Sequence, residues 1–135
     1  MGEVPREPLR ALIARAIVLI VGLGDVVAGA ALLLTPHWFF DNVAPFGTYN
    51  PHFLGDAGAF LLPVGVGLMI AARDLSRFRS LVILGVAVSV LHFLNHLYGS
   101  IAHAESWPVT GAVAVQAVAM VGVLAFTRKP SATPS

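Results

Sequence analysis

Four stretches of almost unbroken apolar residues run along the chain, at about 12–35, 52–72, 80–99 and 107–127. Each has close to the ~20 residues that a helix needs to cross a hydrocarbon layer of ~30 Å. Apolar residues occupy every side of each predicted helix, whereas a helix of a soluble bundle keeps one polar face. Because lipid offers no partner for free backbone groups, we predict that all four stretches are membrane-spanning helices.

Proline and polar residues mark the ends of these predicted helices. Thr35 before Pro36 ends the first helix, because the residue before a proline is driven out of the helical conformation. Asn50 before Pro51 predicts an N-cap and a first helical residue for the second helix. Ser106, followed by a Trp-Pro pair, predicts a similar start for the fourth helix.

The segment 36–51 between the first two helices is rich in Trp, Phe, Pro and Gly. This composition predicts a partly ordered segment that lies in the membrane interface and covers the outer end of the bundle, although an ordinary aromatic anchor has the same composition. The tail 129–135 is predicted to be disordered. Three pairs of small residues have the four-residue spacing that allows close helix packing: Gly24 with Ala28, Gly55 with Ala59, and Gly85 with Ser89.

The composition agrees with a membrane protein. Of the 135 residues, 57% are apolar and only 11% are charged, whereas a soluble domain carries about 25% charged residues. We therefore predict an all-α protein, an integral membrane four-helix bundle that forms a single domain over residues 1–135. The chain has no Cys, which excludes disulfides, thiol chemistry and thiolate metal sites. We find no phosphate-binding glycine loop, serine-nucleophile motif or nucleic-acid-binding patch.

The basic residues fall into three groups, all on one side of a chain that crosses four times. They are Arg6, Arg10, Arg15, Arg73, Arg77, Arg79, Arg128 and Lys129. The positive-inside rule then predicts cytoplasmic N and C termini and a multi-pass protein of the cytoplasmic (inner) membrane. We therefore expect the lipid bilayer to surround the protein.

Ionisable residues inside the apolar stretches are the candidates for function, since placing such a residue in hydrocarbon has a high cost in free energy. His52 and Asp56 are four apart, as are His92 and His96, so each pair shares one face of its helix. Antiparallel packing of the second and third helices places Asp56, His92 and His96 at similar depth in the outer half of the membrane. Asp25, in the first helix, lies further in and would form the floor of the same pocket.

This set of side chains is compatible with several roles. Imidazoles and carboxylates suit a transition metal ion such as zinc, iron or copper, with His52, Asp56, His92 and His96 as ligands. The same groups suit a redox cofactor or a proton path, with Asp25, Asp56, His92 and His96 at a quinone headgroup, or a haem held by two histidines from facing helices. The alternative is a non-catalytic accessory or assembly subunit in which these polar residues only hold helices together.

One resemblance adds to this interpretation. The segment 50–59 has the sequence NPHFLGDAGA, and His92 and His96 follow on the next predicted helix. This arrangement is similar to a pattern in small bacterial four-helix proteins. Their pattern is Asn, any residue, His, any two residues, Arg-Asp, any residue and Gly, followed by two spaced histidines on the next helix. Gly55 stands where those proteins carry the Arg. In its four short spans and size the chain resembles the DoxX-like group. The resemblance implies a place in a membrane redox complex, and a homo-oligomer is the alternative assembly.

Overall fold

The computed structural model describes residues 8–45, 47–103, 106–124 and 127, and all of the regular secondary structure within them is helical. The helices are α1 (Leu9–Leu34), α2 (Pro36–Asn42), α3 (Pro51–Ala71), α4 (Arg79–Ala102) and α5 (Trp107–Val123). The all-α prediction is therefore confirmed. The four longer helices overlap the four apolar stretches, while α2 lies in the segment 36–51, for which the sequence predicts only partial order. The tail 129–135 lies outside the described residues.

Three of these helices, α1, α3 and α4, are long and apolar enough to cross a membrane. Helix α5 is also apolar, but its described part is shorter, at 17 residues. Large apolar side chains point away from the protein along all four helices, for example Val27, Val66, Leu91 and Val118, which are 62%, 42%, 66% and 73% exposed. A surface of this kind is compatible with contact to lipid.

The helix ends follow the predicted signals in part. The Asn50 side chain accepts a hydrogen bond of 3.1 Å from the Phe53 backbone nitrogen, so the predicted N-cap of α3 is confirmed. Helix α5 does begin directly after Ser106, but the Ser106 side chain makes no capping bond. Helix α1 ends before Thr35 as expected, and Pro36 then serves as the first residue of α2.

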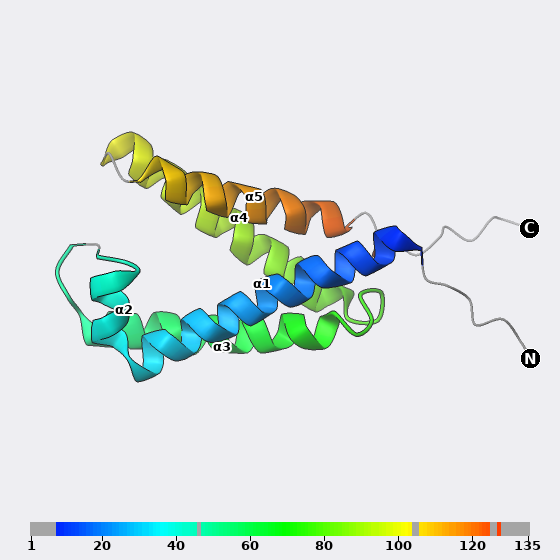
Figure 1. Cartoon of the computed structure of the whole chain (residues 1–135), viewed down its shortest axis with the longest axis horizontal. Helices are drawn as coiled ribbons and strands as arrows, with labels where there is room; N and C mark the ends of the chain where they lie inside the picture. The colour runs from blue at the N-terminus through cyan, green and yellow to red at the C-terminus, as the bar shows by residue number, and fades with distance from the viewer. Residues whose placement is uncertain (1–7, 46, 104–105, 125–126, 128–135) are drawn as a thin grey trace, which may run out of the picture.

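The helices form two antiparallel pairs, α1 with α3 and α4 with α5 (Figure 1). Glycines bring the backbones of α1 and α3 close together: a Cβ added at Gly22 would lie 2.9 Å from the Gly65 carbonyl oxygen. Seven residues further along α1, a Cβ at Gly29 would lie 2.7 Å from the Leu62 backbone nitrogen, and one at Gly58 would lie 2.8 Å from the Gly29 carbonyl oxygen. The two glycines of each helix are seven residues apart, so the close contact extends over one heptad.

For two of the three small-residue pairs, the prediction of close helix packing was wrong. Gly24 and Gly55 have no neighbouring atom within 4 Å of an added Cβ, so neither packs against another helix. They lie on faces of α1 and α3 that the Gly22–Gly29 and Gly58–Gly65 contact leaves free. The third pair agrees with the prediction: Gly85 and Ser89 are buried, and a Cβ at Gly85 would lie 2.5 Å from the Leu68 side chain.

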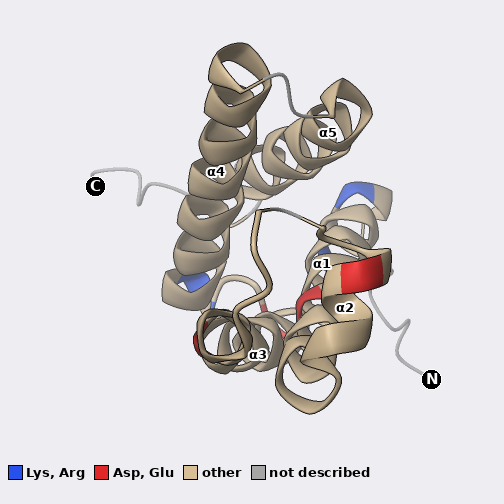
Figure 2. Cartoon of the chain, turned by 90° about the vertical axis from the view of Figure 1, so that its left-hand side faces the viewer, with Lys and Arg blue, Asp and Glu red and all other residues tan. Residues whose placement is uncertain are grey.

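The two pairs pack together at one end of the molecule only. The buried core residues there come from α1, α3, α4, α5 and the α3–α4 turn: Ala14, Val18, Leu68, Ala71, Leu75, Val82, Val86, Met120 and Val123. Toward the other end the pairs diverge (Figure 1). Figure 2, viewed from that end, shows α4 and α5 standing apart from α1, α2 and α3.

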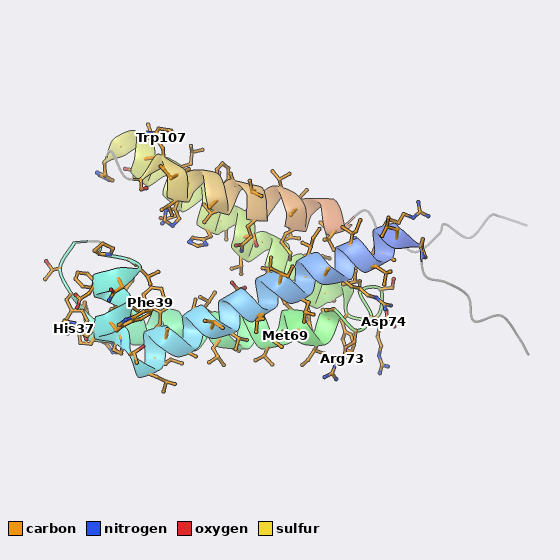
Figure 3. All side chains as sticks on the ribbon, viewed as in Figure 1. His37, Phe39, Met69, Arg73, Asp74 and Trp107 are labelled. Carbon is orange, nitrogen blue, oxygen red and sulfur yellow. The ribbon has the colours of Figure 1, made fainter. Side chains whose placement is uncertain are left out.

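The two ends differ in chemistry as well. The described basic residues Arg10, Arg15, Arg73, Arg77 and Arg79 lie where α1 begins and where α3 meets α4, at the packed end. Figure 3 shows Arg73 with Asp74 at this end, and Trp107, His37 and Phe39 at the diverging end. The basic end and the aromatic end of the bundle are thus opposite each other.

Candidate ligand-binding site

A cavity of about 550 Å³ occupies the space between the diverging helix pairs. We call it the outer cavity, because it is the nearer of two cavities to the diverging end. Its walls are almost entirely apolar and include Phe53 and Phe60 of α3 and Val109 of α5. Phe39 and Phe40 of α2 also line it, so the segment predicted to cover the outer end of the bundle forms part of the cavity wall. Pockets of this size and polarity are typical of sites for small molecules.

His92 and His96 of α4 supply the ionisable part of this wall. Their Nε2 atoms are 3.1 Å apart and their ring centroids 4.8 Å apart. At this distance one imidazole donates a hydrogen bond to the other, so the two rings act as one unit. The i, i+4 spacing predicted this contact, because residues four apart on a helix are neighbours.

Helix α5 holds this part of α4 in place. The hydroxyls of Ser100 and Thr110, both buried, form a hydrogen bond of 2.6 Å. The Thr110 hydroxyl oxygen is also 3.3 Å from the His96 carbonyl oxygen. These contacts fix the turn of α4 that carries His96 against the start of α5.

A second cavity, of about 600 Å³, lies deeper between the pairs and is called the inner cavity. It shares His92 with the outer cavity, together with Ala28, Leu61 and Val88, so the two spaces adjoin. Asp25 of α1 and Gln116 of α5 are its other polar lining residues. The Gln116 side-chain nitrogen donates a 3.4 Å hydrogen bond to the Ser89 hydroxyl, which agrees with the interhelical role expected of a polar residue in such a helix.

The structure does not bring His52 and Asp56 to either cavity. Their side chains lie 3.6 Å apart on the outer surface of α3, and they are 89% and 61% exposed. Asp56 is two residues from Leu54 and from Gly58, which are buried. Two residues turn a helix by roughly 200°, so Asp56 points away from the side on which α3 packs. The four predicted metal ligands are therefore divided into two separate pairs.

The separation of the two pairs affects two of the cofactors that the sequence suggested, a metal ion with four protein ligands and a haem. Among the residues that the structure describes, no group of three or more His, Cys, Asp or Glu side chains could hold a metal ion. The two histidines of the outer cavity lie on the same helix, so they do not form the facing-helix pair expected for a haem. What remains is a pair of adjacent imidazoles in an apolar cavity.

Two features of the site were not identified from the sequence. The wall formed by Phe39 and Phe40 depends on α2, whose seven residues are too few to show a helical repeat. The bond between Ser100 and Thr110 joins two hydroxyls across the α4–α5 turn. Small hydroxyl residues in membrane helices are a signal for such contacts, and this signal could have found the pair.

Comparison of the chain with protein-family models, with curated proteins and with solved structures found no match.

Proposed function

We propose that this protein is a membrane-embedded binding protein for a lipid-soluble redox cofactor of the quinone class, which it holds between its two helix pairs. The observation that carries the proposal is the outer cavity, which is apolar except for a small polar area that includes the linked imidazoles of His92 and His96. A quinone has the complementary pattern, with ring carbonyls that accept hydrogen bonds and an apolar tail.

The proposal includes a topology. We place α1, α3, α4 and α5 across the cytoplasmic membrane, with both termini and the α3–α4 turn in the cytoplasm. The five described arginines at the packed end support this orientation, as does the position of Trp107 at the opposite end (Figure 3). The cavity then lies in the outer half of the membrane, and the gap between the pairs lets a tail extend into lipid.

The roles of the site residues follow from the geometry. Two neutral imidazoles carry two N–H groups, one on each ring: one is directed within the pair, and the other can be donated to a carbonyl oxygen after a ring rotation. Phe53 and Phe60 provide flat apolar surface for the ring. Phe39 and Phe40 of α2 cover the outer side and limit access of water.

Binding of a short-chain quinone such as decylubiquinone to the purified protein in nanodiscs tests the proposal. The chain has two Trp residues, and Trp107 lies close to the cavity residue Val109, so we expect quenching of tryptophan fluorescence that saturates. Replacing both His92 and His96 by Leu should weaken binding at least about tenfold, the equivalent of one or two lost hydrogen bonds.

His52→Leu is the matched control, because His52 is also a histidine in an i, i+4 pair but faces away from the cavity. We expect the control to bind as the unmodified protein does. Equal affinity in the double His92→Leu, His96→Leu variant and in the control would overturn the proposal.

A transition metal ion is a second candidate ligand for the same imidazole pair. Metal-to-imidazole bonds are about 2.0–2.1 Å long, and two such bonds at a near-tetrahedral angle separate the nitrogens by about 3.3 Å. The observed separation of 3.1 Å requires little movement. The remaining coordination positions would be open to water or to an exogenous ligand.

Titration of the metal-free protein with Cu²⁺ or Zn²⁺ distinguishes this role from the first. We expect one ion to bind per chain and to be lost in His92→Ala and in His96→Ala but not in His52→Ala. Identical binding in all three variants would place the ion elsewhere. The resemblance to DoxX-like proteins adds the proposal that the protein works within a membrane redox complex, and a homo-oligomer is the alternative assembly.

A further inference from the structure

Asp25 is a carboxyl group placed near the middle of an apolar helix. It lies nine residues before Leu34, the last residue of α1, which corresponds to about 14 Å from that end of the helix. Its Cβ packs against the backbone of α3, since a Cβ added at Gly65 would lie 2.9 Å from it. The close contact between α1 and α3 therefore holds the Cβ from which this carboxyl group extends.

The carboxyl group has no hydrogen bond or ion pair with the other residues that the structure describes. Asp25 contacts α3 at Gly65 through its Cβ, and it lines the inner cavity. The nearest arginine along α1 is Arg15, ten residues toward the basic end, or about 15 Å away. An isolated carboxylate in such surroundings is costly, so its presence calls for a partner that the described residues do not supply.

The inner cavity has the properties of a site for an organic cation. Its volume is about 600 Å³, and apolar side chains of α1, α4 and α5 form most of its wall. Besides Asp25, it is lined by His92 and Gln116, and because the Gln116 nitrogen donates to Ser89, the Gln116 side-chain oxygen is left as an acceptor. A carboxylate and an amide oxygen within apolar walls complement a positively charged group that carries apolar substituents.

We infer that the inner cavity is a binding site for a lipophilic organic cation, with the Asp25 carboxylate as its counter-ion. This site adjoins the quinone site proposed above and shares His92 with it, but Asp25 lines only the inner cavity and His96 lines only the outer one. Opposite charges attract far more strongly in a low-dielectric cavity than in water, so Asp25 provides most of the selectivity for a cation.

Tetraphenylphosphonium is a suitable probe, because it is soluble in membranes and its charge does not depend on pH. Equilibrium binding of radiolabelled probe to the full chain in nanodiscs should show a saturable component. In Asp25→Asn this component should weaken at least about tenfold, because the amide keeps the size of the side chain but removes its charge. Asp25→Glu should retain binding.

Asp56→Asn is the matched control, since Asp56 is an exposed carboxylate on the outside of α3. It should bind the probe as the unmodified chain does. Decylubiquinone binding should be unchanged in Asp25→Asn, which shows that the variant is folded and keeps a failure of this inference distinct from a failure of the proposed function. No saturable binding to the unmodified chain, or equal binding in Asp25→Asn and Asp56→Asn, would overturn the inference.

Discussion

Replacing Gly29 by Ala tests the close packing of α1 against α3, on which the placement of both cavities depends. The added Cβ would lie 2.7 Å from the backbone nitrogen of Leu62 and 2.9 Å from its Cα and Cβ. Ordinary contacts begin at 3.4 Å. Because the nearest atoms belong to backbone, no side-chain rotation relieves the overlap, and α1 must move away from α3 by about 0.7 Å, the difference between 3.4 and 2.7 Å.

The magnitude follows from two opposing terms. A gap of about 0.5–1 Å removes a quarter to a half of the dispersion energy of each contact along the interface, and overpacking of this kind costs about 1–3 kcal/mol. Alanine is favoured over glycine within a helix by about 0.5–1 kcal/mol, which offsets part of the loss. We therefore expect Gly29→Ala to lower the free energy of unfolding by about 0.5–2 kcal/mol.

Titration with SDS in mixed micelles, followed by circular dichroism, measures this free energy. Gly24→Ala and Gly55→Ala are matched controls, since an added Cβ at either position meets no atom within 4 Å. The controls should be as stable as the unmodified protein or slightly more stable. A Gly29→Ala protein that is as stable as both controls would refute the packing described here.

Two further predictions concern single hydrogen bonds, and both use the same unfolding assay. Thr110→Val keeps the shape of the side chain but leaves the buried Ser100 hydroxyl without this partner, so we expect a loss of about 0.5–1.5 kcal/mol, and Thr110→Ser should recover most of it; equal stability of the Val and Ser variants would contradict this. Asn50→Ala removes the N-cap of α3 and should cost about 0.5–2 kcal/mol, whereas Asn50→Asp should not. Loss of stability in Asn50→Asp as large as in Asn50→Ala would show that the cap is not the cause.

The positions of the long helices could be predicted because the membrane leaves the chain no other choice. An apolar stretch of about 20 residues has to be helical when lipid offers no hydrogen bonds, and proline and asparagine mark where α3 begins. Helix α2 was missed for a physical reason. Pro36 ends α1 through its effect on Thr35, but the same proline is also well suited to the first position of a new helix.

The rotation of each helix about its axis could not be predicted. In a soluble helix the apolar stripe shows which side is buried, whereas helices that are apolar all round carry no such mark. Depth along α3 and α4 could be estimated, but nothing in the sequence showed that Asp56 faces outward. The seven-residue spacing of Gly22 with Gly29 and of Gly58 with Gly65 was a usable signal for the α1–α3 contact. The four-residue spacing used for Gly24 and Gly55 was not.

The histidine pair of α4 could be predicted as a pair, since a four-residue spacing fixes the contact whatever the tertiary structure. Its neighbours could not, because the cavity walls come from α1, α2, α3 and α5. Asp25 and His92 were expected to share one polar space, and both line the inner cavity. Gln116 joins them there from α5.

Ligand protection of single cysteines tests most directly whether the space between the helix pairs is the binding site. The chain has no Cys, so each variant carries one reactive group. Val109 lines the outer cavity, while Ile101, also near the outer end of the bundle, is 70% exposed and does not line it. We predict that decylubiquinone slows maleimide labelling of Val109→Cys and leaves Ile101→Cys unaffected. Equal labelling rates with and without the quinone in Val109→Cys, or equal protection of both positions, would contradict the account.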